Sequence, residues 1–147
     1  MSNSKVIVLW ISKHNPLKCE VEELNRLLGN YKLVIYPHQV MKVEFIYKNY
    51  IKPYLDKGYR VIVVPVLPLW MIYKLVQLGK EFGFEVWFAE MEPVLEVPVG
   101  QDVPYDPDCE VIQRTVTEDG REAIRVSRFK RFRKIKDIVF VYEDLDK

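Results

Sequence analysis

The chain contains two histidines, His14 and His38, and each follows a short, mostly apolar run, residues 6–11 and 33–36. If these runs are neighbouring strands of one parallel sheet, both imidazoles lie at the carboxyl edge of that sheet, where open α/β sheets bind their ligands. An imidazole can act as an acid or a base near neutral pH. The spacing therefore predicts a ligand site at this edge.

The segment after the first run adds further polar groups to that site. Ser12, Lys13, His14 and Asn15 precede Pro16, which is typical of a first helical position. The amides of a helix start stabilise a phosphate or carboxylate, and Lys13 adds a full positive charge. We expect Lys13 and His14 to be catalytic and Ser12 and Asn15 to orient the ligand. The alternative is an ordinary polar loop, with Asn15 capping the helix.

The loop after the third apolar run is the predicted opposite wall of the site. Its expected N-cap, Leu67, has no polar side chain, so the first amides of the next helix need water, backbone or a ligand as acceptor. Trp70 can stack on a base or a sugar, and Leu69 lies beside it. The alternative is that Leu67, Leu69 and Trp70 form a buried patch or a subunit interface.

Two carboxylates follow the fourth apolar run at the same predicted edge, Glu90 and Glu92. With the two histidines they could ligate a divalent metal or divide acid and base roles. However, the chain has no H-x-x-x-H or H-E-x-x-H motif, no dinucleotide-binding glycine motif and no P-loop. We therefore assign no metal and no cofactor, and count Glu90 among the ligand contacts with His38.

Residues 121–136 hold eight basic side chains and one acidic one, interrupted by Phe129 and Phe132. Basic residues interleaved with aromatic ones suit single-stranded nucleic acid. The residues that would make this contact are Arg128, Lys130, Arg131 and Arg133. Two alternatives remain: charges that protect an edge strand, or a basic stretch neutralised by the acidic residues after Tyr142.

Composition limits the class of protein. The 147 residues are 49% hydrophobic and 29% charged, which fits one folded domain, and the net charge of +1 gives no general reason to expect a polyanionic partner. No apolar run is long enough to cross a membrane, so we expect a cytoplasmic protein. Cys19 and Cys109 lie far apart in sequence and are predicted to be reduced thiols. Scarce glutamine with abundant lysine and glutamate favours a thermophilic source.

The elements that must position these residues follow a βαβ pattern. Strands are expected at 6–11, 32–36, 61–66 and 85–89, separated by helices, the second of which Pro53 should kink. The predicted fold class is α/β: a Rossmann-like open sheet of about four parallel strands flanked by helices, with a C-terminal antiparallel hairpin and strand. The whole chain is predicted to be one domain, in which residues 1–92 form the core, 93–108 an irregular connection and 109–147 the hairpin and terminal strand.

The hairpin prediction depends on Asp119 and Gly120. These residues tolerate positive φ angles and lie between two β-prone runs, 110–117 and 122–126, so a two-residue turn is expected. A last β-prone run, 138–142, is predicted to be another strand.

The first ninety residues resemble the CRISPR-associated Rossmann-fold domains and the small single-domain ring nucleases. The resemblance covers residues 5–92 and rests on Ser12-x-His14-x-Pro16 after a strand and on the Pro-Leu-Trp junction within 61–70. It implies a homodimer that binds a cyclic oligoadenylate across the carboxyl ends of its strands without a metal, with Ser12, Lys13 and His14 in contact and the 67–70 loop opposite. The basic hairpin is not part of that pattern.

Three hypotheses follow. The first is a homodimer that binds a nucleotide or cyclic oligonucleotide and cleaves it by placing a ribose hydroxyl in line with its own phosphate. The second is a non-enzymatic nucleic-acid-binding accessory protein that uses the basic residues of 121–136. The third is an assembly module in which the apolar start of the third helix pairs subunits.

Overall fold

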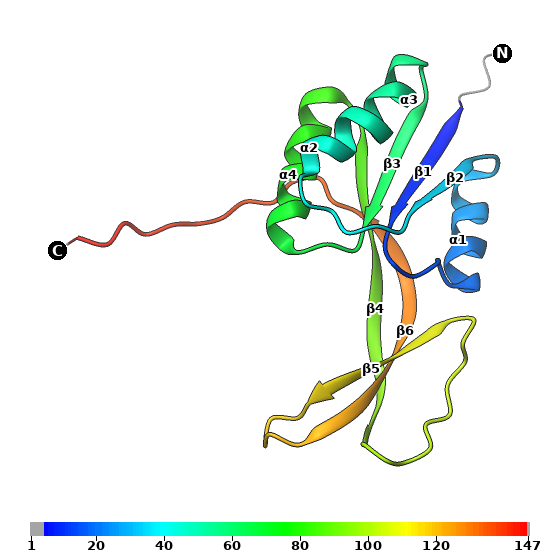
Figure 1. The fold of residues 1–147 in the computed structure, drawn as a ribbon, viewed down its shortest axis with the longest axis vertical. Helices are drawn as coiled ribbons and strands as arrows, with labels where there is room; N and C mark the ends of the chain where they lie inside the picture. Colours follow the sequence, from blue (N-terminus) through cyan, green and yellow to red (C-terminus); the bar gives the residue numbers. More distant parts are fainter. Residues whose placement is uncertain (1–4, 147) are drawn as a thin grey trace.

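The computed structural model describes residues 5–146, which form a six-stranded mixed sheet with the strand order β2-β1-β3-β4-β6-β5 (Figure 1). In this part of the chain the strands are β1 (Val6–Ile11), β2 (Lys32–Tyr36), β3 (Arg60–Pro65), β4 (Glu85–Pro98), β5 (Glu110–Val116) and β6 (Glu122–Lys134). Its helices are α1 (Lys18–Leu28), α2 (Val43–Ile46), the π-helical η1 (Tyr47–Ile51), α3 (Lys52–Asp56) and α4 (Leu69–Phe82).

The first half of the sheet has its core on both faces. β1 pairs in parallel with β2 and with β3, and β3 pairs in parallel with the start of β4. Alternate residues of β1 point to opposite faces: Leu9 packs towards α2–α4, whereas Trp10 packs towards α1. Every residue of β1 is buried, as a central strand covered on both sides requires.

The helix boundaries follow local chemistry, with small differences from the predictions. α1 is capped at Leu17, whose N–H donates to the Glu20 carboxylate over 2.7 Å, so the expected Asn15 cap is wrong. A glutamate at the third helical position reaches back to the N-cap amide, which moves the start of the helix past Pro16. α4 is capped at Pro68 rather than at Leu67.

Pro53 was expected to kink the second helix or split it near Tyr50; the segment instead stays helical from Val43 to Asp56 and changes from α to π and back before Pro53. Because proline has no N–H and its ring clashes with the carbonyl four residues earlier, an undistorted α-helix cannot run through it. The chain widens into the π-helical η1 directly before α3 begins at Lys52.

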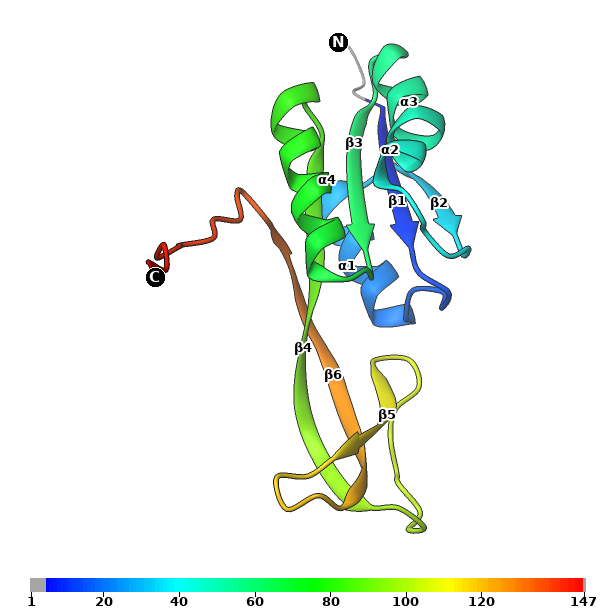
Figure 2. The same ribbon diagram turned by 60° about the vertical axis from the view of Figure 1, so that its left-hand side comes forward.

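The second half of the sheet is an antiparallel arm, which we define as β5, β6 and the part of β4 from Trp87 onward. β4 pairs with β3 only at Glu85 and Val86, and then pairs with β6 from Trp87 to Pro98. Figure 2 shows this arm extending beyond the helical half of the molecule. The predicted irregular connection at 93–108 is therefore strand up to Pro98.

The hairpin between β5 and β6 exists, but its turn is not the predicted two-residue one. Thr117 and Arg121 close the loop through a 2.8 Å backbone hydrogen bond, which leaves Glu118, Asp119 and Gly120 between them. Gly120 has a φ of 85°, the left-handed conformation that three-residue loops require.

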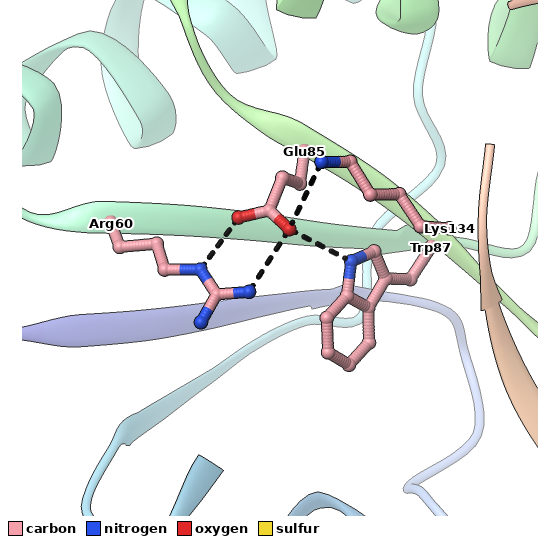
Figure 3. A network of polar contacts seen from close by, with 4 residues as sticks. All are labelled: Arg60, Glu85, Trp87 and Lys134. Carbon is pink, nitrogen blue, oxygen red and sulfur yellow. Dashed lines mark hydrogen bonds and ion pairs between the residues drawn. The ribbon is translucent and has the colours of Figure 1, made fainter. Parts of the chain in front are cut away.

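A four-residue polar network joins the two halves (Figure 3). The Arg60 guanidinium on β3 donates to both carboxylate oxygens of Glu85, at 2.6 and 3.0 Å. Trp87 Nε1 donates to Glu85 over 3.3 Å, and Lys134 Nζ of β6 lies 3.6 Å from the same carboxylate. The network holds β4 at the point where it leaves β3 for β6.

The predicted fold class is wrong. The strands form a single mixed sheet that curls into a half-barrel, instead of a mostly parallel sheet flanked by helices. Within residues 5–146 it is accompanied by only three helical segments: α1, the continuous run α2–η1–α3, and α4. The predicted strand at 122–126 continues through the basic residues to Lys134 as β6, where glutamates of β4 lie opposite several of them. Strand formation by the basic stretch was one of the alternatives, but β6 lies between β4 and β5 and is not an edge strand. The predicted terminal strand at 138–142 has irregular backbone.

Candidate functional site

A large cavity lies where β3 and β4 diverge. Its volume is about 810 Å³. Val64 and Pro65 of β3 lie on one side, Phe88 and Met91 of β4 on another, and β5 residues close it. Two strands that pair at only two positions leave space between their carboxyl halves, so the curl of the sheet itself creates the cavity.

The lining of this large cavity is mostly apolar, with a few polar groups. The described lining residues include no lysine or arginine. Its polar side chains are Ser12, His14, Asn15, Glu20, Tyr105, Glu110 and Gln113. A mostly apolar cavity with a small number of fixed polar groups is the usual form of a small-molecule site.

Trp10 supplies a hydrogen-bond donor that lacks an acceptor. It lines the large cavity, is 3% exposed, and its Nε1 has no hydrogen-bond partner among residues 5–146. A buried N–H without an acceptor costs free energy, about 1–3 kcal/mol. The Nε1 atom is itself inaccessible to solvent, so an acceptor could reach it only if the side chains around it moved.

The two carboxylates of the cavity differ in their surroundings. Burial raises the pKa of Glu20, and the hydrogen bond from the Leu17 amide only partly opposes this shift. Glu110 instead pairs with Arg128 over 3.2 Å and accepts a 2.7 Å hydrogen bond from the Asp106 amide. Glu20 is therefore a buried acceptor that forms no ion pair among residues 5–146, whereas Glu110 is an ion-paired acceptor.

A smaller cavity of about 350 Å³ adjoins the first. Ser12, His14, Val66 and Leu67 line both cavities. The smaller one adds the two groups most suited to an anion or to proton transfer, Lys13 and His38. The ring of His38 packs edge-on against Tyr36 at 5.3 Å, and the backbone N–H of His14 donates to Ser12 Oγ over 3.1 Å.

The structure thus brings together most of the residues expected at the ligand site. Ser12, Lys13, His14, Asn15, His38 and Leu67 all line one or both cavities. Leu69 and Trp70 do not, because they lie on the outer side of the α4 start, 59% and 53% exposed. Trp70 instead contacts Lys74, whose Nζ lies 5.6 Å from the ring centroid.

Glu90 does not join the histidines either. Its carboxylate pairs with Arg131 at 2.9 Å and with Arg133 at 3.3 Å across the β4–β6 ladder. Glu92 likewise pairs with Lys130 at 3.5 Å. Within residues 5–146 no three His, Cys, Asp or Glu side chains are grouped to hold a metal ion.

The basic stretch of 121–136 is matched by acidic residues of neighbouring strands. Besides these pairs, Arg125 lies 3.5 Å from Glu96 and Arg128 lies 3.2 Å from Glu110. The four residues expected to contact nucleic acid, Arg128, Lys130, Arg131 and Arg133, therefore each face a glutamate. For these four residues the neutralising charges come from β4 and β5, and Arg121 pairs with Asp119 of the hairpin loop; none of the ion pairs within residues 5–146 uses the acidic residues at 143–146.

Cys19 and Cys109 form a disulfide, so the expectation of two reduced thiols is wrong. Their Cα atoms lie 5.0 Å apart although 90 residues separate them in sequence. The adjacent backbone is paired as well, since the Cys19 N–H donates to the Asp108 carbonyl over 2.9 Å. This link joins α1 to the connection before β5. Glu20 directly follows Cys19 in sequence and Glu110 directly follows Cys109, and both glutamates line the large cavity.

Sequence reasoning missed Trp10, Glu20 and Glu110 as site residues. Glu20 had a usable signal, because a glutamate three residues after a helix cap belongs at a helix start beside the Ser12–Asn15 loop. No local sequence signal marks Trp10 or Glu110 as site residues, because their positions depend on the curl of the sheet and on the arm.

Comparison with protein-family models, with characterised proteins and with solved structures finds no significant match to this chain. Among the residues that the structure describes, none of the helices has the length and apolar character needed to cross a membrane.

Proposed function

We propose that the protein binds a nucleotide-class ligand, with the base in the large cavity and a phosphate in the small one. The observation that carries this proposal is the junction of two unlike cavities at Ser12 and His14. One is mostly apolar with acceptor carboxylates, and the other contains an ammonium group and two imidazoles. A nucleotide has the same division between a flat, apolar base and an anionic phosphate.

The polar groups of the large cavity suit a base rather than a phosphate. Glu20 and Glu110 would repel an anion, but either can accept a hydrogen bond from an exocyclic amine. Cyclic oligoadenylates, which the family resemblance implies, are one form of this ligand class.

Phosphate binding would depend on Lys13, His14 and His38. Charge-assisted hydrogen bonds from such donors are about twice as strong as neutral ones. α1 begins at Lys18, and the Leu17 N–H at its start already donates a hydrogen bond to the Glu20 carboxylate. The side chains, more than the helix terminus, are therefore the source of affinity in this proposal.

A second candidate function is cleavage of a ribose phosphodiester, favoured by two imidazoles and one ammonium group around the same small cavity. In this reaction the ribose 2′-oxygen attacks the adjacent phosphorus while one imidazole takes the hydroxyl proton. The bond from phosphorus to the leaving 5′-oxygen breaks, and the other imidazole protonates that oxygen. The products are a 2′,3′-cyclic phosphate and a 5′-hydroxyl, and Lys13 would stabilise the added negative charge.

Calorimetric titration tests the binding proposal. The ligands are adenosine, AMP and cyclic oligoadenylates of several ring sizes, and the variants are Lys13→Ala and, as a matched control on the same surface, Lys18→Ala. We expect Lys13→Ala to weaken AMP binding by about tenfold or more while changing adenosine binding little. The proposal fails if the folded protein binds none of these ligands, or if the two lysine variants behave alike.

Cleavage is tested separately, by incubating linear and cyclic oligoadenylates with the protein. We expect a 2′,3′-cyclic phosphate product, no reaction of the 2′-deoxy analogue, and loss of the product in His14→Ala and His38→Ala. Tight binding without any product would reject the cleavage proposal and leave the binding proposal in place.

A further inference from the structure

Residues 138–146 form an extended segment that packs little against the rest of the described chain. Residues 138–142 are all β-branched or aromatic, the composition of a strand, but their backbone is irregular. Val139 is 75% exposed, Val141 94%, Tyr142 83% and Leu145 92%. Side chains of this kind are costly to leave in water and mark contact surfaces.

The root of this segment is fixed to the body, which sets the direction in which it leaves. The Ile135 N–H donates to the Val86 carbonyl over 2.8 Å, and Asp137 binds Lys80 at 2.8 Å. Phe140 still contacts Tyr73, with 5.2 Å between ring centroids. Beyond it, both views show the segment running away from the molecule, on the side opposite to β2 (Figures 1 and 2).

The sheet has two edges, β2 and β5, and their chemistry differs. Residues 33–36 of β2 are all apolar or aromatic, and Leu33, Val34 and Ile35 are only partly buried. β5 exposes the apolar Ile112 and Val116 as well, but the polar Gln113 and Arg114 lie between them and interrupt the apolar edge. An edge strand presents unpaired backbone groups that another strand can bind, and apolar neighbours strengthen this pairing.

We propose that residues 139–146 add as an antiparallel strand to β2 of a second copy of this chain. In that orientation Val139–Tyr142 would lie along the apolar part of β2, and Glu143 and Asp144 would reach its Lys32 end. Two ammonium groups lie there over the ring of Tyr54, Lys32 at 5.3 Å and Lys57 at 5.9 Å from its centroid. The acidic end of the segment therefore meets a basic end of the edge strand.

This exchange is reciprocal if each copy lends its segment to the other, which gives a closed dimer. Eight residues in extended conformation span roughly 26 Å, enough to lie along the whole of a five-residue strand. The segment does not pair with β2 of its own chain, because the fixed root directs the segment away from that strand.

Sedimentation equilibrium of the whole chain tests the proposal with Val141→Pro, Tyr142→Pro and the matched control Val141→Thr. Alternate amides of an added strand face its partner, so at least one proline variant removes a hydrogen bond between the chains. We expect the original chain and Val141→Thr to be dimers and at least one proline variant to be monomeric with unchanged thermal stability at low concentration. A monomeric original chain, or dimers throughout, would overturn the proposal.

Charge reversal identifies the edge. We expect Lys32→Glu with Lys57→Glu to dissociate the dimer, and Glu143→Lys with Asp144→Lys to restore it. Arg114→Glu on β5 is the control and should leave the dimer intact. If Arg114→Glu dissociates the dimer and the β2 variants do not, the segment binds β5 and the assignment to β2 is wrong. Neither result depends on whether the cavities bind a nucleotide.

Discussion

The parallel half and the antiparallel arm are parts of one sheet, but different interactions hold them. In the parallel half, β1 and β3 are buried on both faces, with Leu9 and Ile62 fully inaccessible. In the arm, much of β4 and β6 is exposed, and glutamates face arginines and lysines across the ladder. Apolar burial is the larger source of stability, whereas exposed ion pairs contribute little free energy but select which strands pair.

The cavity lies at the boundary between these two regions and needs both. β1 and β3 provide a rigid floor, with Trp10 and Val64, while the arm provides β5 and the wall that contains Glu110. Functional side chains are most accurately held on rigid elements, and openings usually come from less stable ones. We therefore expect disturbances of the arm to change the shape of the cavity before they unfold the core.

The largest predicted effect is on the core of the parallel half. Leu9→Ala should lower the free energy of unfolding by about 2–5 kcal/mol, because it removes buried atoms and leaves a cavity. The matched change in the arm is Leu95→Ala, at a position that is 39% exposed, and its effect should be much smaller. Urea denaturation measures both, and equal losses would contradict the division into two regions.

The next largest effect is expected from the disulfide. Cys19→Ser with Cys109→Ser removes a link across 90 residues, which typically costs about 2–4 kcal/mol. Amide hydrogen exchange should speed up in β5 and the connection before it, while β1 and β3 keep their protection. A reductant should have the same effect on the original chain and none on the double variant. Loss of protection in β1 equal to that in β5 would show that the link does not act on the arm alone.

Glu85 predicts a stability change in acid. The hydrogen bonds from Arg60 hold the pKa of the Glu85 carboxyl below its ordinary value of 4.5, and burial only partly opposes this. The stabilising contribution is therefore complete above pH 4.5 and is lost as the pH falls through the lowered value. Thermal melts of the original chain and Glu85→Gln should converge towards low pH. A constant difference at every pH would rule this out.

The raised pKa of Glu20 predicts a change of stability with pH of the opposite sign. Burial raises its pKa, so the folded chain holds its proton to a higher pH than the unfolded chain, and stability falls as the pH rises through that interval. Glu20→Gln keeps an acceptor for the Leu17 amide and should flatten this dependence, whereas Glu20→Ala also loses the cap. If melting temperatures of the original chain and Glu20→Gln change in parallel with pH, Glu20 does not cause the slope.

The smallest predicted effect is on the ion pairs of the arm. Glu90→Gln removes the pairs with Arg131 and Arg133 and should cost about 0.2–1 kcal/mol, decreasing in high salt. The exposed Glu81→Gln on α4 serves as the control in urea denaturation at two salt concentrations. A loss as large as that of Leu9→Ala would mean that charge, and not burial, stabilises the arm.

Much of the first half of the chain could be predicted because its signals are local. The buried runs of β1 and β3, the distortion of the helix before Pro53 and the end of α4 near Gly83 each follow from a few adjacent residues. The curled sheet could not be predicted in this way. The charged run of β6 becomes a strand only because β4 places Glu90 and Glu92 opposite it.

The site divides in the same manner. Ser12, Lys13, His14 and His38 were expected at one edge from their positions after short apolar runs, because side chains that follow parallel strands share one edge. All four line one or both cavities there. Glu90 and Trp70 were expected there too but line neither cavity, since the direction of a side chain at the end of an element depends on what packs beside it.

The sequence by itself determined where β1, β2, β3 and the helical segments form, because apolar periodicity, proline and glycine act over a few residues. Only the tertiary structure decided that Cys19 meets Cys109, that β4 leaves β3 for β6, and that Trp10 and Glu110 line a common cavity. These are contacts between residues distant in sequence. Their free energy depends on the simultaneous packing of several elements, which no local pattern records.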